Sequence, residues 1–254
     1  MMENQNNRFS SRFTFLLSAL GIAVGTGNIW RFPRIVASNA GDDGAGAFLV
    51  AWITFLFLWS IPLIIVEYIM GRQSRMGTVG AFSNFMGKPF AFLGGFVGVV
   101  STAIAFFYSV IVGWNIYYFG AIIFTDLPQN NDASWALWSS FQNSSFPIIF
   151  HAIAMTVGGL AIYKGVSSIE KVNKILIPIL LGIVLLSVFR AVSLPGSLDG
   201  IAYLFTPDWS QLRRPGIWVD ALAQNAFDTG AGFGLFLTYA IYIRKKYGIV
   251  KNAF

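Results

Sequence analysis

Cysteine is absent from the 254-residue chain, and charged residues are scarce, at 11%. A chain without cysteine forms no disulfide and no thiolate metal site. Soluble domains carry about 25% charged residues, whereas 56% of the residues here are hydrophobic. This balance is typical of a polytopic membrane protein. The net charge of +6 is expected to belong to loops on the cytoplasmic side, so no nucleic-acid partner is predicted.

Long apolar runs dominate the sequence. Six of them approach or exceed the roughly 20 residues needed to cross a lipid bilayer, and they lie at 12–37, 46–70, 90–125, 147–163, 172–193 and 217–243. Polar, turn-rich segments such as GRQSRMGTVG separate them. The predicted fold class is therefore an all-α polytopic membrane protein with six transmembrane helices.

The distribution of lysine and arginine predicts the orientation. With the N-terminus inside, twelve of the 17 basic residues lie on the cytoplasmic side, as the positive-inside rule requires. This orientation makes 1–11 and 244–254 cytoplasmic and 194–216 extracellular. The expected location is the plasma (inner) membrane of the cell.

Two of the apolar runs are interrupted by glycine and polar residues. The first contains GIAVGTGNIWRFP at 21–33, and the last contains FDTGAGFG at 227–234. Irregular backbone at membrane depth survives only where it is buried or lines a cavity. An unwound helix frees carbonyl groups for a cation and amide groups for a carboxylate. One glycine pair alone would favour close helix packing, but two breaks, beside Asn28 and Asp228, favour a binding site at the midplane.

The segment AVGTGNIWRFP at 23–33 resembles the first-helix signature of the neurotransmitter:sodium symporter family, which includes the bacterial leucine transporter. The likeness continues through EYIMGR at 67–72, GVSSIE at 165–170 and TPDW at 206–209. Family members have ten core helices in two inverted repeats. The resemblance therefore implies that 12–193 forms the first repeat, that 217–243 is the broken opening helix of the second, and that the chain is truncated. Helices seven onward would come from the same gene or from another chain.

The resemblance also implies two sodium sites, both incomplete in this chain. Ala23, Asn28 and Asp228 match ligands of one site, and Gly21 and Val24 match ligands of the other. Carbonyl, amide and carboxylate oxygens are suitable ligands for a hard cation. The remaining ligands of the family belong to helices seven and eight.

The resemblance further implies a neutral α-amino acid as substrate, because Gly25 leaves space for a carboxylate. A large apolar or aromatic side chain is favoured, since Gly230 is smaller than the serine of the leucine transporter. The implied gating residues are Arg31, Tyr108 and Phe227. The full set of implied substrate-binding residues is Ala23, Gly25, Thr26, Gly27, Ile104, Tyr108, Phe227, Asp228, Gly230 and Phe233.

Asp228 departs from the family pattern, which usually has serine or threonine there. Trp52 replaces the tyrosine of the family's chloride site, which makes chloride doubtful. Three roles for Asp228 remain open: an internal anion in place of chloride, a carrier of a coupled proton, and recognition of a cationic substrate. An intramembrane carboxylate is costly and functional by default.

The predicted function is sodium-coupled symport of an amino acid by alternating access, as part of a longer protein. The alternative is a non-transporting fragment or subunit that associates with a second polypeptide or a paralogue. No nucleophile–base pair, metal cluster or phosphate loop occurs in the sequence, so an enzyme is not predicted.

Overall fold

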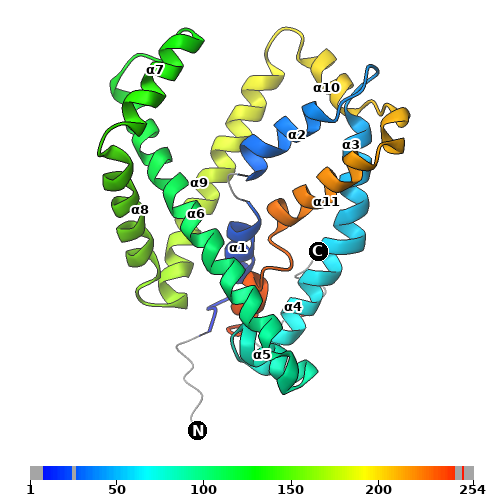
Figure 1. The fold of residues 1–254 in the computed structure, drawn as a ribbon, viewed down its shortest axis with the longest axis vertical. Coiled ribbons are helices and arrows are strands. Elements are labelled where there is room, and N and C mark those ends of the chain that lie inside the picture. Colours follow the sequence, from blue (N-terminus) through cyan, green and yellow to red (C-terminus); the bar gives the residue numbers. More distant parts are fainter. Residues whose placement is uncertain (1–7, 25–26, 244–247, 249–254) are drawn as a thin grey trace.

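The computed structural model describes residues 8–24, 27–243 and 248, and the regular elements in these residues are all helices (Figure 1). In chain order they are α1 (Arg12–Ala23), η2 (Gly27–Arg31), α2 (Phe32–Ser38), α3 (Gly46–Phe55), η3 (Leu56–Ser60), α4 (Ile61–Ser74), α5 (Thr78–Met86), η4 (Lys88–Phe90), α6 (Ala91–Phe124), α7 (Asn131–Gln142), α8 (Phe146–Ile162), α9 (Val166–Val192), α10 (Ser197–Phe205), η5 (Trp209–Arg213), α11 (Pro215–Thr229) and α12 (Leu235–Ala240).

Three helices of the described chain are long and apolar enough to cross a membrane, namely Gly46–Ser74, Lys88–Phe124 and Val166–Val192. The number rises to five if two bent pairs, α1 with α2 and α7 with α8, each count as one span. The region predicted as the sixth span consists of α11 and α12, two shorter helices separated by a non-helical linker at 230–234. The prediction of an all-helical chain with broken first and sixth helices is confirmed.

Several helices begin in segments that have no apolar pattern. α7 lies between two predicted spans, where the Asn130 side chain accepts a hydrogen bond from the Ala133 amide at 2.8 Å and caps the helix. α9 begins at Val166, six residues before the predicted span at 172–193. Its first turns carry buried Glu170, which accepts hydrogen bonds from the Ser10 amide (2.5 Å) and the Thr14 hydroxyl (2.8 Å). Apolar runs locate the membrane-spanning part of a helix and miss polar turns that tertiary contacts stabilise.

The long helices run between two ends of the molecule (Figure 1). α5 lies at one end, while α7 and α10 lie at the other. α6 packs along α8, α4 along α12, α3 along α11 and α1 along α9. The helices thus place the end of α1 and the linker after α11 near the middle of the molecule, beside α6.

An aromatic cluster joins the start of the described chain to α4 and α12. The Phe9 and Phe15 ring centroids are 5.3 Å apart, and those of Tyr68 and Phe236 are 5.6 Å apart. All four side chains are buried. By contrast, apolar side chains such as Phe119 and Leu186 on the long helices are about 70% exposed, as expected for residues that face lipid.

The segment from α10 to η5 is fixed against the start of α3. The Ala45 and Gly46 amides donate to the carbonyls of Tyr203 and Thr206, each at 2.9 Å. Asp208 caps η5 by accepting from the Ser210 amide at 3.0 Å and the Ser210 hydroxyl at 2.6 Å. These hydrogen bonds from Ser210 hold the pKa of Asp208 below its usual value, so this carboxylate stays charged at neutral pH.

Candidate functional site

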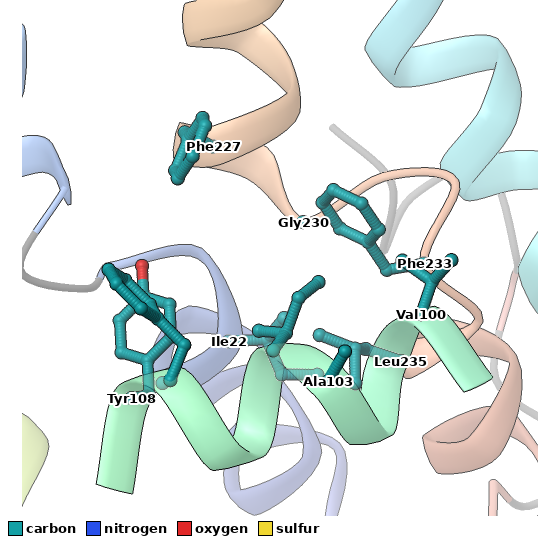
Figure 2. Close-up of a pocket in the computed structure, with 11 residues that line it drawn as sticks. Ile22, Val100, Ala103, Tyr108, Phe227, Gly230, Phe233 and Leu235 are labelled. Carbon is teal, nitrogen blue, oxygen red and sulfur yellow. The ribbon is translucent and has the colours of Figure 1, made fainter. Parts of the chain in front are cut away.

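A cavity of about 680 Å³ lies between α1, α6 and the linker that joins α11 to α12 (Figure 2). Among the described residues that line it, none is charged, and the Tyr108 hydroxyl is the polar side-chain group. Figure 2 shows Val100, Ala103 and Tyr108 along α6, with Phe227, Gly230 and Phe233 facing them. The complete lining is Gly21, Ile22, Val100, Ala103, Ile104, Phe107, Tyr108, Phe227, Gly230, Phe233 and Leu235.

Five of the predicted substrate-binding residues lie together in this lining. They are Ile104, Tyr108, Phe227, Gly230 and Phe233. Ile22, Val100, Ala103, Phe107 and Leu235 also line the cavity and were not predicted. Val100 lies four residues before Ile104 and Phe107 three residues after it, on the same face of α6, so helical periodicity could have identified these two. Ala103 directly precedes Ile104 and does not follow this spacing.

Three glycines break the helix between α11 and α12. Gly230, Gly232 and Gly234 have φ angles of +66°, +89° and +70°. Side chains of L-residues resist this left-handed region, whereas glycine enters it at little steric cost. The sequence GAGFG therefore ends α11 and forms a non-helical linker that lines the cavity before α12 begins.

The buried carboxylate of Glu67 in α4 holds this linker. One oxygen accepts hydrogen bonds from the amides of Gly232 (2.6 Å) and Gly234 (3.3 Å), and the other accepts from the Leu237 amide (3.1 Å). These are amides that the broken helix leaves without an intrahelical partner. The sequence motif EYIMGR contains Glu67, but no role was predicted for it. A lone carboxylate inside an apolar span was the signal that could have identified it.

A second polar chain ties α11 to α3 and η3. The Ser60 hydroxyl donates to the Asn225 side-chain oxygen at 2.9 Å, and the Asn225 amide group donates to the Trp52 carbonyl at 2.9 Å. Ser60 and Asn225 are fully buried. η3 is a π-helical turn, a type that widens the helix and occurs frequently at functional sites.

The carboxylate of Asp228 is directed to α3 and to its own helix. Oδ2 accepts from the Trp52 indole at 3.2 Å, and Oδ1 accepts from the Gln224 amide group at 2.6 Å. Asp228 is buried and does not belong to the described lining of the cavity. Both oxygens thus have protein donors, and the adjoining residue Phe227 contacts the cavity instead.

Two of the predicted gating residues lie against each other. The Arg31 guanidinium carbon is 4.4 Å from the centre of the Phe227 ring, a cation–π distance. Arg31 also donates a hydrogen bond to the side-chain oxygen of Gln224. The third gating residue, Tyr108, lines the cavity beside Phe227. Arg31, Gln224 and Asp228 thus form a continuous polar chain along one side of Phe227.

The predicted cation ligands lie on both sides of the first break. Gly21 and Ala23 lie at the end of α1, Val24 directly follows it, and Asn28 lies in η2. Asp228, the fifth predicted cation ligand, lies in α11. Gly25 and Thr26, predicted for the substrate carboxylate, lie outside the described residues. No cluster of histidine or acidic side chains suited to a metal occurs in the described chain. The available donors are carbonyl, amide and carboxylate oxygens, which suit sodium better than a transition metal.

The fold and the cavity define a class. A bundle of apolar helices whose two interrupted members meet at a cavity near the middle is the arrangement of secondary transporters. The sequence matches the model of the sodium:neurotransmitter symporter family at residues 6–145 and 139–254. The chain belongs to this family, as the sequence motifs predicted, and its apolar helices make it a multi-pass membrane protein. The family is one of sodium-coupled transporters, not of enzymes.

Individual relatives agree with this assignment. An uncharacterised sodium-dependent transporter of Methanocaldococcus jannaschii is 33% identical over 98% of this chain and 52% of the relative. The uncharacterised sodium-dependent transporter YhdH of Bacillus subtilis is 30% identical over 100% of this chain and 56% of the relative. The crystal structure of MhsT in complex with L-phenylalanine superposes with a TM-score of 0.81 at 33% identity, covering 97% of this chain and 56% of MhsT. The chain thus spans about half the length of the relatives that it matches.

Proposed function

We propose that the chain forms the substrate cavity for sodium-coupled symport of a large apolar or aromatic neutral α-amino acid. The observation that carries this proposal is the uncharged 680 Å³ cavity between the two helix breaks. A cavity of this size and lining suits a bulky apolar side chain. The first break would bind the substrate carboxylate through Gly25, Thr26 and Gly27, with the Tyr108 hydroxyl as a further donor. MhsT, a relative of similar fold, binds L-phenylalanine in its crystal structure.

Sodium is proposed to bind at two sites beside the substrate. Ala23, Asn28 and Asp228 would contribute to one, and Gly21 and Val24 to the other, with further ligands from outside this chain. Because substrate and sodium would share the first break, each would raise the affinity for the other reciprocally. Alternating access would come from rocking of the broken helices against α6, α8 and α9.

The orientation is proposed from charge. Four basic residues lie in or directly after α4, in η4 and in the α8–α9 connection, namely Arg72, Arg75, Lys88 and Lys164. The acidic segment with α7 is assigned to the opposite side. The positive-inside rule then makes the first group cytoplasmic and the segment 194–216 extracellular. The cell's plasma membrane is the proposed location.

Binding of the amino acid should require sodium. Purified 254-residue chain is titrated with each of the twenty amino acids, in sodium and in potassium buffer, and its melting temperature is measured. We expect stabilisation by aromatic or large aliphatic amino acids in sodium only, since the cavity offers no partner for a charged side chain. Stabilisation that is independent of sodium, or limited to charged amino acids, would contradict the proposal.

Chloride is proposed to have no role, because Asp228 supplies a fixed negative charge beside Trp52 and Gln224. Exchanging sodium chloride for sodium gluconate should leave amino-acid affinity unchanged. The Asp228→Ser variant should bind the amino acid more weakly than the unmodified chain in gluconate. In chloride, the variant should regain part of that affinity. Asp220→Asn, which alters a second acid of α11 that is half-buried and bonded to Asn39, is the control. Strong chloride dependence of the unmodified chain would rule out this role.

A second candidate is a membrane subunit that works only with another polypeptide. This candidate is favoured by the proposed sodium sites, both of which need further ligands from outside this chain. No thermal response from the chain alone, with a response restored by co-expressing the relatives' remaining helices, would support it over autonomous binding.

A further inference from the structure

One peptide group of the α11–α12 linker is held at both of its ends. The carbonyl of Phe233 accepts a hydrogen bond from the Ser101 hydroxyl of α6 at 2.6 Å. The amide of Gly234, in the same peptide group, donates to Glu67 of α4 at 3.3 Å. Two helices, each more than a hundred residues before the linker, thus fix the orientation of a single peptide plane.

The linker needs such external fixation. Gly232 and Gly234 flank Phe233 and both have positive φ angles. Glycine populates a wide range of backbone angles, so neither neighbour restricts the rotation of this peptide group by its own sterics. The orientation of the Phe233 ring, which lines the cavity, therefore depends on the hydrogen bonds that hold its backbone.

Ser101 differs in this respect from its neighbour Thr102. Thr102 is exposed and donates only to the carbonyl of Gly98, at 2.8 Å within its own helix. Ser101 has the equivalent intrahelical acceptor, the Val97 carbonyl at 2.9 Å, but makes its shorter contact with Phe233. Ser101 also lies between Val100 and Ala103, which line the cavity. Its hydroxyl therefore connects the α6 wall of the cavity to the wall formed by the linker.

We propose that Ser101 is a positioning residue that sets the place of Phe233 and thereby selects bulky apolar substrates. Loss of the hydroxyl leaves the Phe233 carbonyl without a donor beside an apolar cavity, and the peptide group turns to find another. The ring then leaves the position where it contacts a large side chain. A small amino acid, which does not reach Phe233, is affected less. This inference rests on the proposed function for its substrate.

The test compares Ser101→Ala with Ser101→Thr, which keeps a hydroxyl, and with the control Thr102→Ala. Sodium-dependent dissociation constants for L-phenylalanine and L-alanine are measured on each purified chain. We expect Ser101→Ala to weaken L-phenylalanine binding about tenfold, the loss of one good hydrogen bond, and to change L-alanine binding much less. Ser101→Thr should recover most of the affinity, and Thr102→Ala should behave as the unmodified chain.

Amide hydrogen exchange of the ligand-free chain tests the positioning role independently of substrate binding. The amides of 232–235 should exchange faster in Ser101→Ala than in Thr102→Ala, because the linker has lost one of its two anchors. Equal exchange in the two variants would overturn the proposal, as would equal weakening of both amino acids. If the unmodified chain binds no amino acid in sodium, the proposed function fails, while the exchange comparison still decides whether Ser101 positions the linker.

Discussion

Replacing Glu67 with alanine should remove most of the stability of the α11–α12 linker and abolish ligand binding. Three amides, those of Gly232, Gly234 and Leu237, lose their acceptor in this variant. Each buried donor left without a partner costs about 1–3 kcal/mol, so the free energy of unfolding should fall by several kcal/mol. The melting temperature in detergent and the sodium-dependent response to L-phenylalanine measure the two effects.

Glu67→Gln separates the contribution of the two carboxylate oxygens. A glutamine can still accept from Gly232 and Gly234 through one oxygen, but it presents an NH₂ group to the Leu237 amide. We expect an intermediate loss of stability. Asp132→Ala, which removes an exposed carboxylate in the first turn of α7, is the control and should leave both measurements unchanged. A Glu67→Ala chain with unchanged melting temperature would show that the linker does not depend on this carboxylate.

Gly230→Ala should weaken the binding of aromatic amino acids in the cavity much more than the binding of small ones. A Cβ atom at Gly230 would lie 2.9 Å from a methyl group of Ile22, and both residues line the cavity. The φ angle of +66° adds backbone strain of about 1–2 kcal/mol for a residue with a side chain. Affinity for L-phenylalanine should fall by about tenfold or more, a loss of about 1.4 kcal/mol, with a smaller loss for L-alanine.

Gly232→Ala distinguishes strain from obstruction. Gly232 also has a positive φ angle, but a Cβ there would meet Leu63 at 3.6 Å, an ordinary contact outside the cavity. This variant should lose stability and keep its preference for large substrates. Ile22→Ala combined with Gly230→Ala should restore part of the affinity for L-phenylalanine, since it removes the Cγ2 methyl group that the new Cβ meets. Equal loss of preference in both glycine variants would refute the steric explanation.

The break between α11 and α12 shows what local sequence can predict. Alternating glycines in GAGFG predict that α11 cannot continue, and the structure has positive φ angles at Gly230, Gly232 and Gly234. The prediction succeeds because the conformational freedom of glycine belongs to the residue itself. The apolar runs predict membrane-spanning segments for a similar reason, because the length and composition of a segment decide whether it can cross the bilayer.

The hydrogen-bond partners of the polar side chains could not be predicted from local sequence. Asp228 was predicted from the resemblance as a site residue, but its hydrogen bond to Trp52, 176 residues away, was not predicted. Glu67 and Gly232 are separated by 165 residues, and Ser101 and Phe233 by 132. Each side chain could satisfy its hydrogen bonds in several ways. The packing of the helices selects among them.

The sequence by itself determined the helical membrane class, the family, the two interruptions and half of the cavity lining. These depend on composition, glycine placement and spacing along one helix, all of which act over a few residues. Only the tertiary structure decided that Glu67 and Ser101 hold the linker from opposite sides and that Arg31 lies on Phe227. Such contacts join segments more than a hundred residues apart, and their geometry exists only once the helices have packed.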